Sequence, residues 1–254
     1  MVPSRPSLII VGHGSSASLA AEQAAEEHAL TLRQSQRFGT ILTHFIQRGN
    51  ALPELPKGEV FILPFFMSDG FFVRKKIPEI FGLEDRLRRD ENRSLIQCDA
   101  IGVDAELAEI VIDSVKEQTK KLRVTDKDVS VLLVAHGSQK STASREAALF
   151  QRDQVRARSL FERVEVALLE EPPLIIDMLR TLEAEGAKLI IVVGLFSANG
   201  PHAAEDVPKA VQAFLTQMQD KKRAEVHYLG AVGVRREIVK LIQNSISRRA
   251  AEIG

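Results

Sequence analysis

The sequence predicts an α/β protein made of two homologous parallel-sheet halves, residues 1–124 and 125–254, which face each other across a central cleft. Three observations support this fold class. The chain repeats its own motifs, its short apolar runs suit strands that are buried on both faces, and longer amphipathic stretches follow those runs.

The internal repeat is visible in three pairs of segments. SLIIVGHGS at 7–15 recurs as SVLLVAHGS at 130–138. LPFFMSDG at 63–70 corresponds to GLFSANG at 194–200, and AIGV at 100–103 corresponds to AVGV at 231–234. Because the motifs keep the same order, we interpret the chain as a duplication whose halves join near residues 123–128.

Short apolar runs and amphipathic stretches alternate through both halves. Strands are expected at residues 8–11, 41–46, 60–63 and 95–97, and at 129–134, 164–169, 189–193 and 226–229. Helices are expected at residues 17–37, 79–89 and 107–122, and at 145–161, 174–185, 206–219 and 236–249. This alternation predicts parallel strands joined by right-handed helical crossovers.

Composition describes an ordinary globular chain and excludes several functional classes. The 34 Lys and Arg residues balance the 34 Asp and Glu residues, so no overall field favours nucleic acid or an anionic membrane. A single cysteine, Cys98, excludes an internal disulfide and fits a reducing compartment. Neither a signal peptide nor a membrane span is evident, and the phosphate-binding loop of nucleotide hydrolases is absent from the sequence. We expect a cytoplasmic protein without nucleotide, nucleic acid or membrane partner.

Potential metal ligands follow three consecutive strands of the second half. His136, Glu170 and His202 come after the expected first, second and third strands of that half. Ligands of open parallel sheets bind outside the carboxyl ends of the strands, so these side chains should meet at one edge. Two imidazoles and a carboxylate suit Fe²⁺, Co²⁺, Ni²⁺ or Zn²⁺. A histidine after a strand also occurs as a plain turn residue, but the clustering of three ligands favours a metal site.

The segments around these residues resemble the sirohydrochlorin cobaltochelatase and ferrochelatase family, the ATP-independent tetrapyrrole chelatases. The matching patterns are VAHGS at 134–138, VALLEEP at 166–172 and GPHAAEDVP at 200–208. YLGAVG at 228–233 is similar to the last strand and turn of that family. The resemblance covers nearly the whole chain and implies a duplicated long form with two chelatase-like halves.

The resemblance implies a lyase-type enzyme that inserts Co²⁺ or Fe²⁺, with Ni²⁺ as a further candidate, into sirohydrochlorin or a related tetrapyrrole. His136 and His202 match the metal-binding and catalytic histidines of the family, and Glu170 matches its acidic ligand. Neutral imidazoles can also accept the two pyrrole protons. The distance from glutamate to proline is shorter here, so Glu171 remains an alternative. Relatives of half the length pair two copies, so a duplicated chain implies a monomer.

The first half departs from the family pattern at the metal ligands. His13 is retained, but Phe72 stands at the counterpart of His202, and the counterpart of Glu170 near residues 45–48 has no carboxylate. We expect a degenerate metal site in residues 1–124 and the functional site in residues 125–254. Whether His13 contributes is left open.

Several further residues are candidates for contact with a flat, carboxylate-rich macrocycle. Phenylalanines of the first half either line the cleft or belong to the core: Phe65, Phe66, Phe71 and Phe72. Cations stand at 74–76 where the second half has Ala-Glu-Asp, although charged runs are usually just solvated. The residues expected to bind substrate are Ser138, Lys140, Gly200, Phe72, Arg74 and Lys75.

Two other functions remain open from the sequence. A metal or tetrapyrrole carrier would keep the same fold and ligands without catalysing insertion. A phosphoryl-transfer enzyme could use His136, because a fold does not fix a function. The absence of a phosphate-cradling glycine loop counts against this second alternative.

Overall fold

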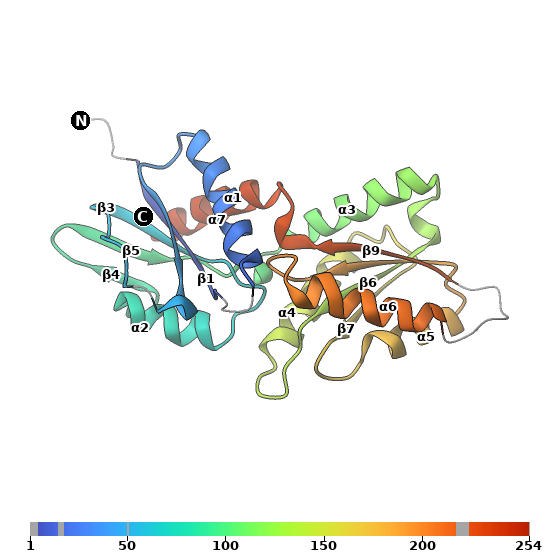
Figure 1. The fold of residues 1–254 in the computed structure, drawn as a ribbon. Helices are drawn as coiled ribbons and strands as arrows, with labels where there is room; N and C mark the ends of the chain where they lie inside the picture. Colours follow the sequence, from blue (N-terminus) through green and yellow to red (C-terminus); the bar gives the residue numbers. More distant parts are fainter. Residues whose placement is uncertain (1–4, 15–17, 50, 217–223, 254) are drawn as a thin grey trace. The chain divides into compact units, whose positions relative to one another are not determined.

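Each half of the sequence contributes the strands of one sheet in the computed structural model, which describes residues 5–14, 18–49, 51–216 and 224–253 (Figure 1). The first sheet has the order β2-β1-β3-β5-β4. Its strands are β1 Ser7–Gly12, β2 Ile41–Phe45, β3 Gly58–Pro64, β4 Leu87–Arg89 and β5 Arg93–Gln97. The second sheet has the order β7-β6-β8-β9. Its strands are β6 Val129–Ala135, β7 Arg163–Leu168, β8 Leu189–Gly194 and β9 Glu225–Ala231.

The predicted parallel α/β fold is confirmed in both halves. All pairs of the second sheet are parallel, and in the first sheet only the β4–β5 pair is antiparallel among the described strands. Strands β1 and β6 lie inside their sheets, and every residue of each is buried. Such strands can be apolar on both faces because helices cover both sides of the sheet.

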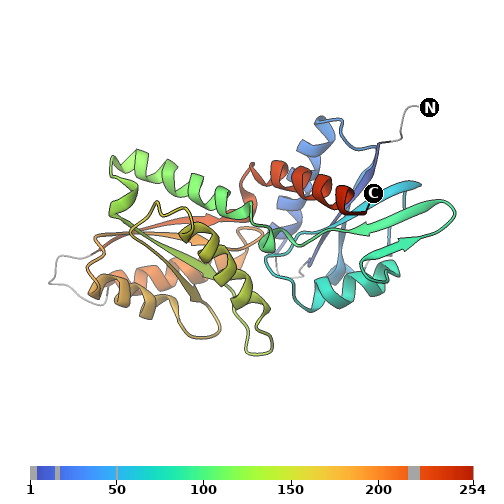
Figure 2. The ribbon, with the colours of Figure 1, turned by 180° about the vertical axis from the view of Figure 1, so that it is seen from behind.

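Helices pack on both faces of each sheet (Figures 1 and 2). They are α1 Ala20–Gln34, α2 Ile77–Phe81, α3 Leu107–Leu122, α4 Ala143–Arg156, α5 Ile175–Ala184, α6 Val207–Thr216 and α7 Ile238–Ile253. Helices α1 and α7 lie side by side against the first sheet, and α2 packs on a separate core cluster. In the second unit α3 lies beside α4. Helices α5 and α6 contact each other and contribute side chains to one core cluster of this unit.

The last helix of each repeat groups with the sheet of the other repeat. One compact unit consists of Met1–Asp104 with Arg236–Gly254, and the other of Ala105–Arg235. Helix α3 therefore belongs to the unit of β6–β9, and α7 belongs to the unit of β1–β5. The compact units thus differ from the sequence repeats, which we place at 1–124 and 125–254, by the exchange of these two helices.

The prediction of a helix at residues 79–89 is wrong. Helix α2 ends at Phe81, because Gly82 takes a left-handed conformation and its amide donates to the Pro78 carbonyl. The chain then turns through Asp85 and Arg86, both at positive φ, and returns as strand β4. Asp is a usual first residue of such a two-residue hairpin turn, but Arg86 stands where glycine normally follows, so the usual sequence signal is incomplete.

The remaining helices agree with the sequence apart from their ends. The helix expected at 145–161 runs from Ala143 to Arg156, because Ala157–Phe161 form turns that lead into β7. Residue 17, at the expected start of the first helix, and residue 219, at the expected end of the sixth, lie outside the described residues. Among the described helices, none is long and apolar enough to span a membrane.

His44 on β2 predicts a pH-dependent stability of the first unit. Its side chain is buried edge-on against Phe81, and this burial lowers the pKa of His44 below its ordinary value. The unfolded chain therefore binds a proton at a higher pH than the folded chain, so acidification through about pH 6.5 favours unfolding. We expect the free energy of unfolding, measured by urea titration, to fall between about pH 7 and 5. His44→Phe should show a shallower fall, and an unchanged slope would contradict the assignment.

Candidate metal site

The metal-site candidates of the second half lie at the carboxyl edge of the second sheet. His136 directly follows β6, which pairs with β7 on one side and β8 on the other. The carbonyl of His136 accepts hydrogen bonds from the amides of Leu169 and Glu170, at 3.1 and 3.0 Å. Parallel pairing therefore brings the end of β7 against the end of β6, as expected for strand ends in one sheet.

A tight turn fixes the ring of His136. Gly137 has a φ of +74°, a conformation that glycine adopts without cost, and its amide donates to Ser144 Oγ at 3.0 Å. The Nδ1 atom of His136 lies 2.9 Å from the Gly137 carbonyl oxygen. Because a carbonyl oxygen only accepts hydrogen bonds, Nδ1 carries the proton and Nε2 is left to bind a cation.

His202 is held in the same tautomer by a carboxylate. It begins a single π-helical turn, η5 (His202–Asp206), which leads into α6. Its Nδ1 atom lies 2.8 Å from Asp206 Oδ2, an acceptor, so Nδ1 again carries the proton. Such π-turns inside helices are frequent at functional sites. Here the turn directs the Nε2 atom of His202 away from Asp206.

The two free imidazole nitrogens face each other. His136 Nε2 and His202 Nε2 are 3.1 Å apart. With both Nδ1 atoms protonated, two neutral rings would oppose two lone pairs at that distance, which is repulsive. The pair is therefore suited to bind a cation shared by the two nitrogens. Two nitrogens bound to a tetrahedral Zn²⁺-like ion at about 2.0–2.1 Å would be about 3.3 Å apart, close to the observed separation.

The two neighbouring glutamates have different surroundings. Glu170 Oε1 lies 3.7 Å from His136 Nε2, and the Glu170 side chain is half exposed. Glu171 turns away: its Oε1 accepts from the Ser138 amide at 3.0 Å, and its Oε2 is paired with Arg145. The geometry therefore favours Glu170 over Glu171 as a third ligand. Within the described residues no group of three or more His, Cys, Asp or Glu side chains forms a ready-made metal site.

The first half has the same turn with different side chains. His13 follows β1, its Nδ1 atom is 2.7 Å from the Gly14 carbonyl oxygen, and Gly14 has a φ of +72°. Phe72 begins the π-turn η2 (Phe72–Lys76), which is the counterpart of η5. The Phe72 ring lies against His13 with ring centroids 4.5 Å apart. In this half a phenyl ring thus replaces the second imidazole.

The expected substrate-binding residues lie near these turns in both units. In the second unit Ser138 Oγ accepts from the Lys140 amide, and the Gly200 carbonyl accepts from Ala204 at the start of η5. In the first unit Arg74 is paired with Asp69 at 2.9 Å, and Lys75 is exposed. Three of these residues, Ser138, Lys140 and Gly200, therefore lie beside the turns that carry His136 and His202, and Phe72, Arg74 and Lys75 belong to η2.

The phenylalanines of the first half divide between core and surface. Phe65 is buried and its ring contacts His28 edge-on, so it belongs to the core. Phe66 and Phe72 are partly exposed and stacked at 6.0 Å, and the Phe71 side chain is exposed.

Asp206 is a functional candidate that the sequence analysis did not single out. Its spacing four residues after His202 was the available signal, because residues i and i+4 share a helix face. A carboxylate behind a metal-binding imidazole fixes its tautomer and increases its basicity, and its loss typically costs about 10–100-fold in metal affinity or activity. We expect Asp206→Asn to lower Co²⁺ affinity within that range, measured by calorimetry. Glu205→Gln, which removes an exposed carboxylate paired with Lys209, is the matched control and should retain affinity.

Two solved structures share the fold of this chain. The chain aligns over 95% of its length with DR2241 of Deinococcus radiodurans, a multi-domain protein described as similar to chelatases, with a TM-score of 0.80 and 20% identity. It spans 54% of that longer chain. CbiX, described as the terminal enzyme of siroheme biosynthesis in denitrifying bacteria, aligns over 95% of this chain and 98% of its own, with a TM-score of 0.73 and 23% identity. The chain therefore has the chelatase fold in two repeats.

The sequence comparison identifies the family. The CbiX family model matches residues 7–118 and 130–249, and the chain belongs to the CbiX family. A protein of Halobacterium salinarum named as a probable sirohydrochlorin cobaltochelatase is 26% identical over 97% of this chain and 91% of its own. The resemblance drawn from the histidine motifs is thus confirmed.

Proposed function

We propose that this chain is a lyase-type chelatase that inserts Co²⁺ or Fe²⁺ into sirohydrochlorin, with the site at His136 and His202. The observation that carries the proposal is the pair of Nε2 atoms 3.1 Å apart, both held in the tautomer that leaves their lone pairs free. The names of the relatives, a cobaltochelatase and an enzyme of siroheme synthesis, support the substrate and the two metals. Ni²⁺ suits the same donors.

The reaction requires a held metal ion and acceptors for two protons. His136 and His202 would present the ion through their Nε2 atoms, with Glu170 as a third, exposed ligand. As the ring nitrogens take the ion, each imidazole is freed and accepts one pyrrole proton, so the two protons lost by the macrocycle are accounted for. Asp206 stabilises the imidazolium that forms at His202.

Incomplete coordination suits a metal that must be transferred. Two imidazoles and one distant carboxylate leave positions open for the ring nitrogens. Such a site binds the ion less tightly than a closed four-ligand site, which lowers the cost of transferring it. Because protons compete with the ion for both Nε2 atoms, metal binding and insertion should weaken as the pH falls.

Binding of the macrocycle would fall to residues beside the strand-end turns. We assign this role to Ser138, Lys140, Gly200, Phe72, Arg74 and Lys75. The Arg74 side chain is 68% exposed although it is paired with Asp69, so it can also reach a carboxylate of the substrate. We further propose that the chain acts as a cytoplasmic monomer, because the duplication supplies both halves in one polypeptide.

An insertion assay tests the function. Purified chain is mixed with metal-free sirohydrochlorin and Co²⁺ or Fe²⁺, and the absorbance change of the macrocycle is followed against the uncatalysed rate. Acceleration by catalytic amounts of protein supports a chelatase. Binding of metal or macrocycle without acceleration would identify a carrier and overturn the proposal.

The two glutamates should have separable effects. Glu170→Gln removes the carboxylate nearest His136 and should reduce Co²⁺ affinity by roughly 10-fold with little change in stability. Glu171→Gln removes the negative charge that pairs with Arg145, although its amide oxygen can still accept from the Ser138 amide, so it should lower the melting temperature. Calorimetric titration and thermal unfolding of both variants measure the two effects. A larger loss of metal affinity in Glu171→Gln would reverse the ligand assignment.

A further inference from the structure

The position of His202 depends on the loop that leads to it from β8. The contact of its Nδ1 atom with Asp206 lies within η5, so it does not fix that turn relative to His136. Residues 195–201 join the end of β8 to the start of η5. A shift of this loop would therefore change the 3.1 Å distance between the two Nε2 atoms.

Backbone hydrogen bonds hold the end of this loop in the same way in both repeats. At the start of η5 the Gly200 carbonyl accepts from the Ala204 amide at 2.8 Å. At the start of η2 the Gly70 carbonyl accepts from the Arg74 amide at 2.9 Å. The two loops therefore differ in the contacts of their side chains, not in this backbone pattern.

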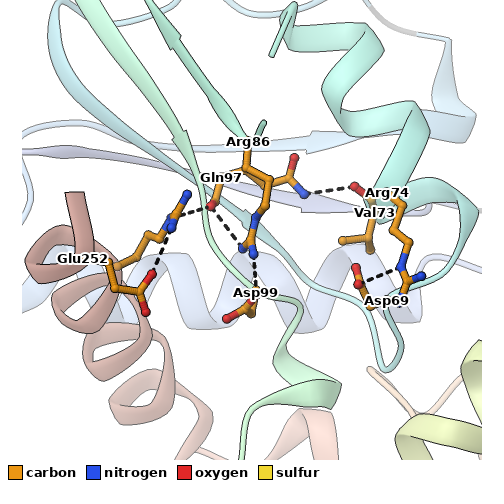
Figure 3. A network of polar contacts seen from close by, with 8 residues as sticks. Asp69, Val73, Arg74, Arg86, Gln97, Asp99 and Glu252 are labelled. Atoms are coloured by element: carbon orange, nitrogen blue, oxygen red, sulfur yellow. Dashed lines mark hydrogen bonds and ion pairs between the residues drawn. The ribbon is translucent and has the colours of Figure 1, made fainter. Parts of the chain in front are cut away.

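In the first repeat a side chain of the neighbouring strand holds the turn. Gln97 at the end of β5 is buried, and its side-chain amide donates to the Val73 carbonyl of η2 at 2.9 Å (Figure 3). Asp69, in the loop before η2, is paired with Arg74 at 2.9 Å in the same view. Turn η2 is thus linked to β5 through Gln97.

The second repeat has a different residue at the equivalent strand position. Gln97 pairs with Ile62 of β3. At the same place in the second sheet, Tyr228 pairs with Val192 of β8. The Tyr228 hydroxyl is buried beside Gly194 and has no hydrogen-bond partner among the residues that the structure describes. Tyr228 therefore does not hold η5 as Gln97 holds η2.

An irregularity in β9 provides another point of attachment. The register between β8 and β9 shifts by one residue after Tyr228, and Gly230 has a φ of +82° there. The amide of the next residue, Ala231, donates to Asn199 Oδ1 at 3.0 Å. Because Ala231 is buried, its amide requires an acceptor, and the exposed Asn199 side chain supplies one.

We propose that Asn199 is a positioning residue for His202. Its side-chain oxygen links the loop before η5 to β9 and so holds His202 Nε2 at the distance from His136 Nε2 at which both can bind one ion. In the first repeat Asp69 stands at the position of Asn199 and pairs with Arg74, while Gln97 holds the turn. The role of Asn199 rests on the proposed metal site.

Asn199→Ala removes the acceptor at an exposed position and should leave the chain folded. We expect its Co²⁺ affinity, measured by calorimetry, to fall about tenfold, the lower end of the effect of losing an outer-shell partner. Asn199→Asp keeps an acceptor oxygen and should restore the affinity close to that of the wild-type chain. Asp69→Ala is the matched control, because it changes the equivalent loop of the other repeat, and it should retain the affinity.

A double-mutant cycle separates positioning of His202 from a general structural effect. If Asn199 acts through His202, Asn199→Ala should not weaken Co²⁺ binding further in a chain that already carries His202→Ala. The visible absorption of bound Co²⁺ depends on its ligands. In Asn199→Ala this spectrum should change toward that of His202→Ala, because the second imidazole is displaced from the ion.

Unchanged affinity in Asn199→Ala, an Asn199→Asp variant as weak as Asn199→Ala, or the same loss in the His202→Ala chain would overturn the proposal. An equal loss in Asp69→Ala would also overturn it. Failure of the wild-type chain to bind Co²⁺ would overturn the proposed metal site and the role of Asn199 with it. Tight binding by both the wild-type chain and Asn199→Ala would overturn the role of Asn199 alone.

Discussion

His136→Ala and His202→Ala are each expected to lower Co²⁺ affinity and insertion rate by more than about 100-fold, beyond the usual effect of losing an outer-shell partner. Each substitution removes one of the two facing Nε2 atoms and leaves a single imidazole. Neither side chain belongs to the buried core, because His202 is exposed and His136 is partly exposed. The variants should therefore unfold at nearly the wild-type temperature.

Calorimetric titration with Co²⁺ and the insertion assay measure the two losses. The wild-type chain should bind about one tight ion, since Phe72 replaces the second imidazole of the first half. His13→Ala is the matched control, because it removes the equivalent histidine of the other repeat and should retain the tight ion. Two equivalent ions per wild-type chain, or a His13 variant as inactive as the His202 variant, would contradict this assignment. Either result would show that the first repeat carries a functional metal site.

The placement of the candidate ligands was predictable because parallel strands end at a common edge. His136, Glu170 and His202 each follow a strand of one sheet, and pairing of β6 with β7 and β8 brings those ends together. The choice between Glu170 and Glu171 was not predictable. It depends on the Arg145 side chain from α4, which pairs with Glu171 and leaves Glu170 facing His136. Contacts of this kind are set by tertiary packing.

The errors in the expected fold have physical causes that a sequence pattern does not carry. Strand β4 follows a turn at Asp85 and Arg86 that has positive φ without glycine. The sequence pattern therefore predicted a helix that extends beyond the actual end of α2. The exchange of α3 and α7 between compact units also leaves no trace in either helix, because both keep the amphipathic pattern of a helix that covers a sheet. Repeat boundaries and packing boundaries are separate properties of a duplicated chain.

Gly233 and Gly102 occupy equivalent positions in the two repeats. Each lies against the loop that leads to His202 or to Phe72, respectively. The Gly233 amide donates to the Phe196 carbonyl at 2.9 Å, and the Gly102 amide donates to the Phe66 carbonyl at the same distance. A Cβ atom at Gly233 would lie 2.4 Å from the Ser197 carbonyl oxygen, and one at Gly102 would lie 2.1 Å from that of Met67. Because these neighbours are backbone atoms, either steric clash can be relieved only if the loop moves.

Gly233→Ala should therefore displace the loop that leads from β8 to His202, whereas Gly102→Ala should displace the loop that leads from β3 to Phe72. We expect each substitution to lower the free energy of unfolding by about 3 kcal/mol, the upper part of the range for overpacking. Urea titration measures this loss. Only Gly233→Ala should also weaken Co²⁺ binding, because only its loop carries one of the paired imidazoles.

The two variants are matched in chemistry and in expected instability, so a difference in metal affinity between them reports the site and not general unfolding. Co²⁺ titration at a temperature where both variants remain folded gives that difference. Equal affinity in the two variants would mean that the position of His202 does not depend on the loop after β8. A loss in Gly102→Ala alone would place the tight ion in the first repeat, where His13 has a phenyl ring as its neighbour.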